Sequence, residues 1–117
     1  MDIKEATAVL SSLAQPTRLE AFRLLVAHEP EGLPAGDVAR LLDVPQNTSS
    51  THLAILAGAG LARSERNGRS IIYRADLDRF RELTLYLLKD CCSGNPEICT
   101  PLVAELVPCC GPATGKR

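Results

Sequence analysis

Apolar residues recur at three- and four-residue spacing through the first half of the chain, which is the period of an amphipathic helix. The pattern predicts a first helix over residues 3–13. It predicts a second helix from Pro16, whose ring suits the first turn of a helix, to a point before Pro30. Residues 29–34 are expected to form a turn-rich connection.

The next apolar pattern predicts two short helices in close succession. The first begins at Pro34 and is broken by Asp43-Val44-Pro45, and the second runs from Gln46 to Ala57. Two short helices with a tight turn between them are typical of a helix-turn-helix. Gly58 and Gly60 are expected to end the second of these helices by adopting positive φ.

Alternating residues on both sides of Asn67-Gly68 predict a β-hairpin, with strands at 61–66 and 69–74. Asp76 is placed to cap a fifth helix. Apolar residues cover nearly the whole circumference of this helix over 83–88, which indicates burial on all sides and suggests a subunit interface. The predicted fold class is mainly α with a small β-hairpin (α+β).

The composition fits one small domain with an aliphatic core, because the chain has 117 residues, 45% of them hydrophobic and only 3% aromatic. The formal net charge is −1, so contact with nucleic acid would require a local cluster of arginines. The sequence contains neither an apolar run of about eighteen residues nor a signal-peptide pattern, so we expect a soluble cytoplasmic protein with no membrane partner. Thiols in that compartment favour metal binding or redox chemistry over disulfides.

The predicted fourth helix opens with a polar run that suits hydrogen bonding to phosphates and base edges better than it suits a helix interior. We take this run, with the two arginines beside the hairpin turn, as the candidate DNA contacts: Gln46, Asn47, Thr48, Ser49, Ser50, Thr51, His52, Arg66 and Arg69. The alternatives are a polar helix start that merely faces water, and edge-strand charges that deter aggregation. A helix-turn-helix followed by an arginine-rich hairpin and another helix favours a winged helix on DNA.

Three segments resemble the ArsR/SmtB family of metal-sensing repressors. Residues 13–19 (LAQPTRL) are similar to the family's Leu-x-x-Pro-x-Arg-Leu signature, and 50–56 (STHLAIL) to its Ser-x-His-Leu-x-x-Leu recognition helix. Residues 60–73 resemble the Gly-Leu, Arg-x-Gly-Arg and Tyr pattern of its wing. The resemblance runs from about residue 9 to 90 and implies a homodimeric winged-helix repressor of operator DNA, which pairs through its first and last helices.

The cysteines depart from one common arrangement in that family, in which a Cys-x-Cys pair lies in the first helix of the helix-turn-helix. The matching stretch here, 35–42, has no cysteine. All five cysteines follow residue 90, at Cys91, Cys92, Cys99, Cys109 and Cys110. The first three resemble the family members that carry thiolates after the last helix. We therefore divide the chain into a domain at 1–90 and a sensing tail at 91–117.

Thiolates are soft ligands, and three of them suit trivalent arsenic or antimony, whereas a closed zinc site prefers four. Residues 93–96 (SGNP) cannot continue a helix, so Cys99 has room to fold back towards Cys91 and Cys92. The sequence thus predicts As(III) or Sb(III) as the inducer, with no catalytic cofactor. For Cys109 and Cys110 three roles stay open: they bind a second ion, they complete the first site, or they bind nothing.

Two alternatives to a metalloid-responsive repressor stay open from the sequence. The first is a repressor of the same fold that senses cadmium, zinc or an oxidant. The second is a thiol-dependent arsenate reductase, which would use one activated cysteine and a resolving partner. No anion-cradling glycine loop lies beside a cysteine, so we expect a protein that is not an enzyme.

Overall fold

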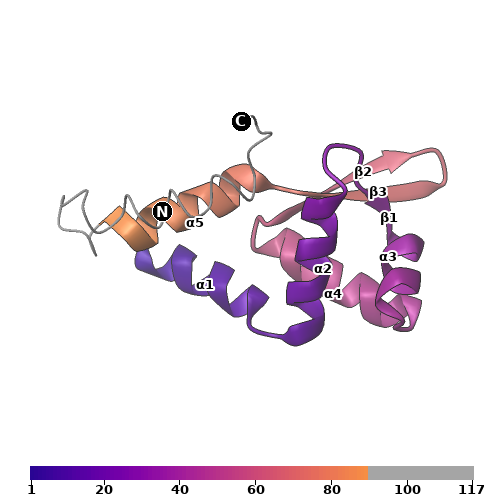
Figure 1. Cartoon of the computed structure of the whole chain (residues 1–117), viewed down its shortest axis with the longest axis horizontal. Coiled ribbons are helices and arrows are strands. Elements are labelled where there is room, and N and C mark those ends of the chain that lie inside the picture. The colour runs from indigo at the N-terminus through magenta and orange to yellow at the C-terminus, as the bar shows by residue number, and fades with distance from the viewer. Residues whose placement is uncertain (90–117) are drawn as a thin grey trace, which may run out of the picture. The chain divides into compact units, whose positions relative to one another are not determined.

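The computed structural model describes residues 1–89. The chain divides into two compact units, residues 1–83 and 84–117, and the core, the sheet and the helix-turn-helix all belong to the first. The elements of the described part follow in order (Figure 1): α1 (Ile3–Leu13), α2 (Pro16–Ala27), β1 (Leu33–Pro34), α3 (Ala35–Leu42), α4 (Gln46–Gly58), β2 (Ala62–Asn67), β3 (Ser70–Ala75) and α5 (Leu77–Lys89). The α+β class predicted from the sequence is confirmed.

The first two helices begin with side-chain caps. In α1, Glu5 N donates to Asp2 Oδ1 at 2.8 Å and Asp2 N donates to Glu5 Oε1 at 3.0 Å, which is a capping box. In α2, Gln15 Oε1 accepts from Arg18 N at 2.8 Å, and Pro16 occupies the first turn. Arg18 Nε also donates to the carbonyl of Ser12, so one arginine ties the end of α1 to the start of α2.

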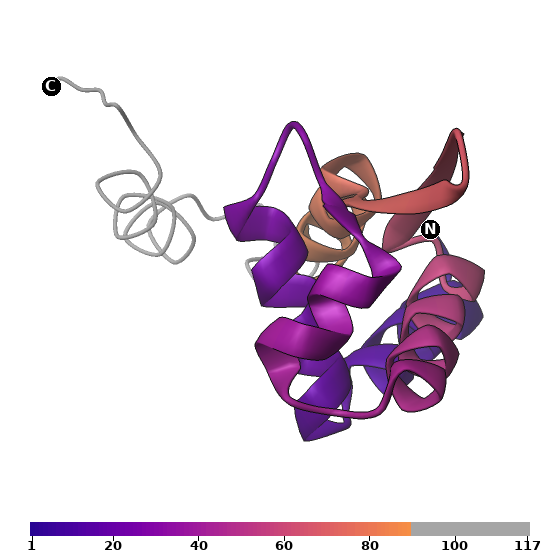
Figure 2. The same ribbon diagram turned by 90° about the vertical axis from the view of Figure 1, so that its right-hand side faces the viewer.

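The helix-turn-helix consists of α3, a turn over residues 43–45, and α4 (Figure 2). Asp43 adopts the left-handed conformation with φ 56°, although it is not glycine. The turn is held by a hydrogen bond of 3.1 Å from Val44 N to Ala39 O, and α4 continues from Pro45, whose carbonyl accepts from Ser49 N. Both helices predicted for this segment are confirmed, but Pro34 is the N-cap of α3 and not its first residue.

The sheet has three antiparallel strands in the order β1-β3-β2. The sequence analysis expected only a turn at β1, but Leu33 and Pro34 pair with Tyr73 and Ile72. Proline is tolerated there because β1 is an edge strand and needs no second row of donors.

The hairpin was predicted correctly, but each strand lies one residue further along the chain than expected. Asn67 pairs with Ser70 and closes the ladder, so the loop is Gly68-Arg69. Only Gly68 has a positive φ, 65°, in this loop. The shift places Arg69 at the tip of the wing.

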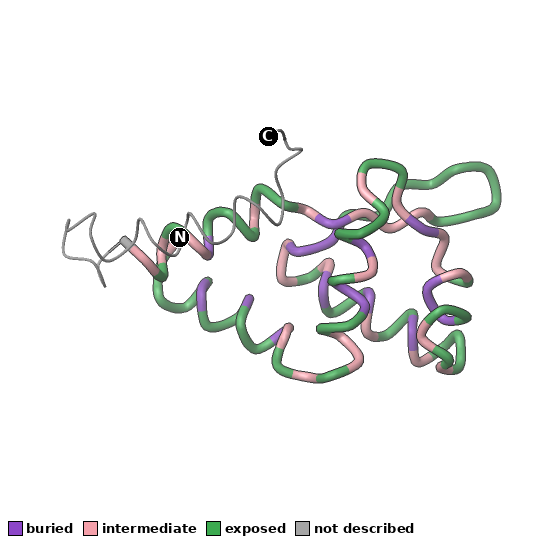
Figure 3. Tube along the Cα trace, in the orientation of Figure 1, coloured by how far each residue is buried: buried purple, intermediate pink, exposed green. Residues whose placement is uncertain are grey.

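The core is aliphatic, as the composition predicted, and is buried between the helices and the sheet (Figure 3). α2 packs against α1, α3, α4 and β3. Among the described residues, the largest side chains with less than 2% exposure are, apart from one serine, apolar: Val9, Leu25, Val38, Leu53, Leu56 and Leu61. α4 ends before Gly60, which has φ 86°, whereas Gly58 lies inside the helix with no positive φ, so the role predicted for Gly58 was wrong.

Ser49 is the exception in this core. Its side chain is 1% exposed, and its Oγ has no hydrogen-bond partner among residues 1–89. A buried hydroxyl without a partner loses its hydrogen bonds to water and gains none in return. Ser49 therefore occupies a packing position on the inner face of α4.

We predict that Ser49→Ala raises the free energy of unfolding by about 1 kcal/mol, because it removes an unsatisfied buried hydroxyl. The matched control is Ser50→Ala, an exposed serine on the same turn of α4, which reports the gain in helix propensity alone. Thermal and urea denaturation of both variants measure the difference. A Ser49→Ala protein less stable than the Ser50→Ala protein would contradict the burial of this hydroxyl.

Candidate nucleic-acid interface

The start of α4 is open to a negatively charged ligand. Its N-cap, Pro45, makes no side-chain hydrogen bond, and its first turn contains no acidic residue. The unpaired amides and the helix dipole together give this end a partial positive charge. α1 and α2, by contrast, are capped by Asp2 and Gln15. The N-cap of α3, Pro34, also makes no side-chain hydrogen bond, but Asp37 places a negative charge in its first turn, so the start of α4 suits phosphate oxygens better.

Most of the polar run predicted to contact DNA is accessible at this helix start. Exposed side chains are those of Gln46, Asn47, Ser50 and Thr51, and Thr48 is half-buried. Asn47 Oδ1 accepts from Thr48 N at 2.9 Å, and Thr51 Oγ1 donates to Asn47 O at 3.0 Å. The side-chain NH2 of Asn47, and the side-chain NH2 and carbonyl oxygen of Gln46, remain available to bind base edges or phosphates.

Two predicted contacts differ from the rest of this run. Ser49 points into the core, so its side chain is not on the surface that would face DNA. His52 is half-buried, and its Nδ1 is enclosed without a partner within the described part of the chain. Because only part of its ring is accessible, His52 can offer at most one edge to a ligand. The sequence pattern alone did not separate these two residues from their neighbours.

The four arginines of the hairpin form two groups with different roles. Arg66 and Arg69 are exposed at the wing tip, and neither forms an ion pair among the described residues. Arg63 Nε lies 4.0 Å from Asp76 Oδ2, and Arg74 Nη2 lies 3.1 Å from Glu29 Oε1. The wing tip therefore carries two uncompensated positive charges, whereas the base of the wing is neutralised.

Side chains at the start of α5 contact α1, the end of α4 and the wing, and the sequence pattern did not predict these contacts. Arg79 Nε donates to the carbonyl of Ala59, the C-cap of α4, at 3.4 Å. Its other nitrogens contact Glu82 at 3.0 Å and Glu5 of α1 at 3.8 Å. Asp76 accepts from Arg79 N and lies near Arg63 of the wing. One short segment thus touches α1, the end of α4 and β2.

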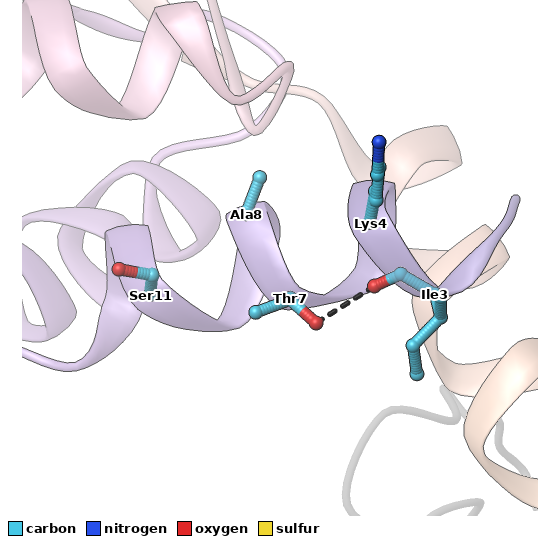
Figure 4. Close-up of a pocket in the computed structure, with 5 residues that line it drawn as sticks. All are labelled: Ile3, Lys4, Thr7, Ala8 and Ser11. Carbon is cyan, nitrogen blue, oxygen red and sulfur yellow. Dashed lines mark hydrogen bonds between the residues drawn. The ribbon is translucent and has the colours of Figure 1, made fainter.

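An exposed face of α1 is hollowed and carries both apolar and polar side chains. A shallow pocket on it is lined by Ile3, Lys4, Thr7, Ala8 and Ser11 (Figure 4). Ile3 is 66% exposed, although isoleucine usually lies inside proteins. The hydroxyl of Thr7 donates to the carbonyl of Ile3 at 2.7 Å, so its hydrogen bond is satisfied within the helix. This face suits the approach of another helix.

The predicted thiolate ligands lie outside the described residues, since every cysteine follows residue 90. The helix predicted from Thr100-Pro101 lies there as well. Within residues 1–89, no group of three or more His, Cys, Asp or Glu side chains is arranged to hold a metal ion. No helix in that same range is long and apolar enough to cross a membrane.

Comparisons with known proteins agree with this geometry. Residues 13–65 match the family model described as a helix-turn-helix domain, which includes α2, α3, α4 and part of the wing. No curated protein matches the sequence.

Several solved structures share the fold. An ArsR-like transcriptional regulator from Rhodococcus sp. RHA1 is 25% identical, with a TM-score of 0.68 over 83% of this chain and 89% of that one. A possible transcriptional regulator for arsenical resistance is 27% identical, with a TM-score of 0.61 over 69% of this chain and 81% of that one. A homodimeric winged helix-turn-helix DNA-binding domain from Mycobacterium bovis is 25% identical, with a TM-score of 0.61 over 74% of this chain and 78% of that one.

The order of elements, the open start of α4, the arginine-tipped wing and these neighbours all lead to one assignment. The chain contains a helix-turn-helix domain in a winged-helix fold, and it is similar to transcriptional regulators of the ArsR family.

Proposed function

We propose that this regulator is a metalloid-responsive repressor. In the proposal, an apo homodimer binds operator DNA, and trivalent arsenic or antimony releases it by binding to Cys91, Cys92 and Cys99. One observation carries the metalloid part: all five cysteines of the chain follow residue 90, behind a DNA-binding fold that has none.

The DNA part rests on the surface formed by α4 and the wing. The uncapped start of α4 presents exposed amide and hydroxyl side chains beside its free backbone N–H groups. In a helix-turn-helix, the N-terminal residues of the second helix meet base edges in the major groove. Arg66 and Arg69, with no acidic partner within the described residues, are suited to phosphates beside that groove.

The proposed dimer uses α1 and α5. Exposed apolar side chains on these helices, Ile3, Leu10, Leu77 and Phe80, would be buried by a second subunit. A domain of this size gains stability from such burial. The Mycobacterium bovis domain with this fold is described as homodimeric. Two subunits would place two copies of α4 in successive major grooves of a pseudo-palindromic operator.

The metalloid specificity follows from ligand chemistry. Three soft thiolates match a trigonal ion with a lone pair, and the ligands must lose their protons before they bind. A structure named as a possible regulator for arsenical resistance shares 27% identity with this chain. Release requires that the ion prefer the DNA-free conformation, and a coupling of about 3 kcal/mol weakens operator binding by on the order of a hundredfold.

The arrangement of the cysteines in two adjacent pairs supports a different inducer: zinc, cadmium or an oxidant. Cys91-Cys92 and Cys109-Cys110 are adjacent, and together they supply the four sulfurs of a zinc or cadmium site or two thiol pairs for an oxidant. Titrating operator release with arsenite, antimonite, cadmium, zinc and peroxide distinguishes these inducers. Turnover of arsenate in the presence of thiol would instead favour the enzyme.

We predict that Arg66→Met weakens binding to a duplex selected from random DNA by the wild-type protein. Each wing would lose one phosphate contact, so the slope of log K against log salt becomes shallower by about 1.8 for the dimer. Fluorescence anisotropy at several KCl concentrations measures the slope. Arg23→Met, which removes an exposed arginine from α2, is the matched control and keeps the wild-type slope. An unchanged slope in Arg66→Met would remove this arginine from the interface.

We predict that Cys91→Ser, Cys92→Ser and Cys99→Ser each retain operator affinity and lose release by arsenite. Each variant removes one of three soft ligands and leaves the DNA-binding unit intact. Anisotropy with and without arsenite measures release, and calorimetry measures ion binding. Cys109→Ser with Cys110→Ser tests the second pair. Wild-type release by arsenite in all three single variants would refute the three-thiolate site.

A further inference from the structure

Arg74 lies near the end of β3, at the base of the wing. In the sheet register it is directly opposite Arg63, so the two side chains share one face of the hairpin. Like charges at such positions repel, and each guanidinium turns to its own carboxylate. Arg63 approaches Asp76, and Arg74 donates from Nη2 to Glu29 Oε1 at 3.1 Å. Arg74 is therefore already engaged within the protein.

The Arg74–Glu29 pair is more enclosed than the other ion pairs of the described residues. Its side chains are 31% and 19% exposed, whereas those of Arg81 and Asp78 are 71% and 86% exposed. Arg74 Nε and Glu29 Oε2 are buried without other partners among residues 1–89. Removing one member leaves the other charge enclosed and unpaired, which is costly in a way that the loss of a surface pair is not.

The pair fastens the wing to the segment that enters the helix-turn-helix. Glu29 lies in the connection between α2 and β1, and Gly32 follows it. Gly32 has φ 77°, and a Cβ there would lie 2.5 Å from the carbonyl oxygen of Tyr73 and 2.6 Å from Arg74 Cγ. The backbone of the connection is thus in direct contact with β3. Pro34, two residues later, pairs with Ile72 and is also the N-cap of α3.

We propose that Glu29 and Arg74 form a positioning clamp that sets the wing relative to the helix-turn-helix, and that Arg74 does not contact DNA. The pair, the close approach of Gly32 and the two-residue strand β1 join β3 to the start of α3 at one place. The wing tip and α4 must reach the same duplex together, so the clamp determines whether Arg66 and Arg69 arrive at phosphates when α4 occupies the groove. This inference rests on the proposed binding of operator DNA.

The experiment uses the full chain, the duplex selected by the wild-type protein, and the variants Arg74→Met and Glu29→Gln. We expect each variant to bind on the order of tenfold more weakly, which corresponds to about 1.4 kcal/mol, and its salt slope to become shallower, because Arg66 and Arg69 no longer reach phosphates. The double variant should bind no more weakly than either single variant. Glu29→Gln is the decisive case, since it removes no positive charge and can make the slope shallower only by displacing the arginines of the wing tip.

Hydroxyl-radical footprinting separates positioning from general stability. In Arg74→Met we expect protection beside the groove, where the wing lies, to weaken while protection around α4 persists. All measurements are made at a temperature at which circular dichroism shows the variants folded. If Arg74→Met does not fold, Glu29→Gln, which keeps the shape of the side chain, carries the test. The exchanged pair Arg74→Glu with Glu29→Arg should recover affinity and the wing footprint.

Three results would overturn the clamp. A shallower salt slope in Arg74→Met but not in Glu29→Gln, with no recovery in the exchanged pair, would make Arg74 a phosphate contact. Wild-type affinity in folded Arg74→Met and Glu29→Gln would remove the pair from DNA binding altogether. Equal loss of both footprints would make its role one of stability. If the wild-type protein itself selects no duplex, it is the proposed function that fails.

Discussion

The burial of Leu53 and Leu56 is the constraint on which the rest of the structure depends. Both lie on α4 with no exposed surface, and they contribute to the same core as Leu25 of α2. A helix has one rotational setting once two such side chains are buried a turn apart. That setting turns Gln46, Asn47, Ser50 and Thr51 outward together, so the core determines which residues the protein offers to DNA.

The N-terminal turn of α4, which is proposed to contact DNA, has several features that lower its stability. Its N-cap makes no side-chain hydrogen bond, residues 47–49 have modest helix propensity, and Ser49 Oγ is buried without a partner among residues 1–89. The turn before it places Asp43 in the left-handed region, which favours glycine. α1 has none of these features and starts with a full capping box. The weaknesses therefore gather around the start of α4, where, for all but the buried Ser49, a ligand can supply the missing hydrogen bonds.

The sequence predicted the helices well because their signals are local. Proline at the start of α2, the break at 43–45 and Asn67-Gly68 each act within a few residues. It missed β1, whose two residues are defined only by a partner strand far along the chain, and it grouped Arg74 with the other hairpin arginines. It also counted Ser49 among the polar surface residues, since polarity alone does not reveal the inner face of a helix start. These three features depend on contacts between residues far apart in the chain, and a local pattern of residue types does not specify such contacts.

The positions of the arginines and carboxylates explain how a chain with net charge −1 can present a positive surface to DNA. Within the described residues, several acidic groups pair with arginines at the contacts between elements: Glu29 with Arg74, Asp76 with Arg63, and Glu5 with Arg79. Arg66 and Arg69 at the wing tip form no ion pair with a described residue, so their positive charges remain available to a phosphate. The Arg79 contacts at 3.4 Å and 3.8 Å are long, and long polar contacts cost little to rearrange. Because the core is closely packed, the Arg79 contacts at the start of α5 are easier to change than the packing that sets the position of α4.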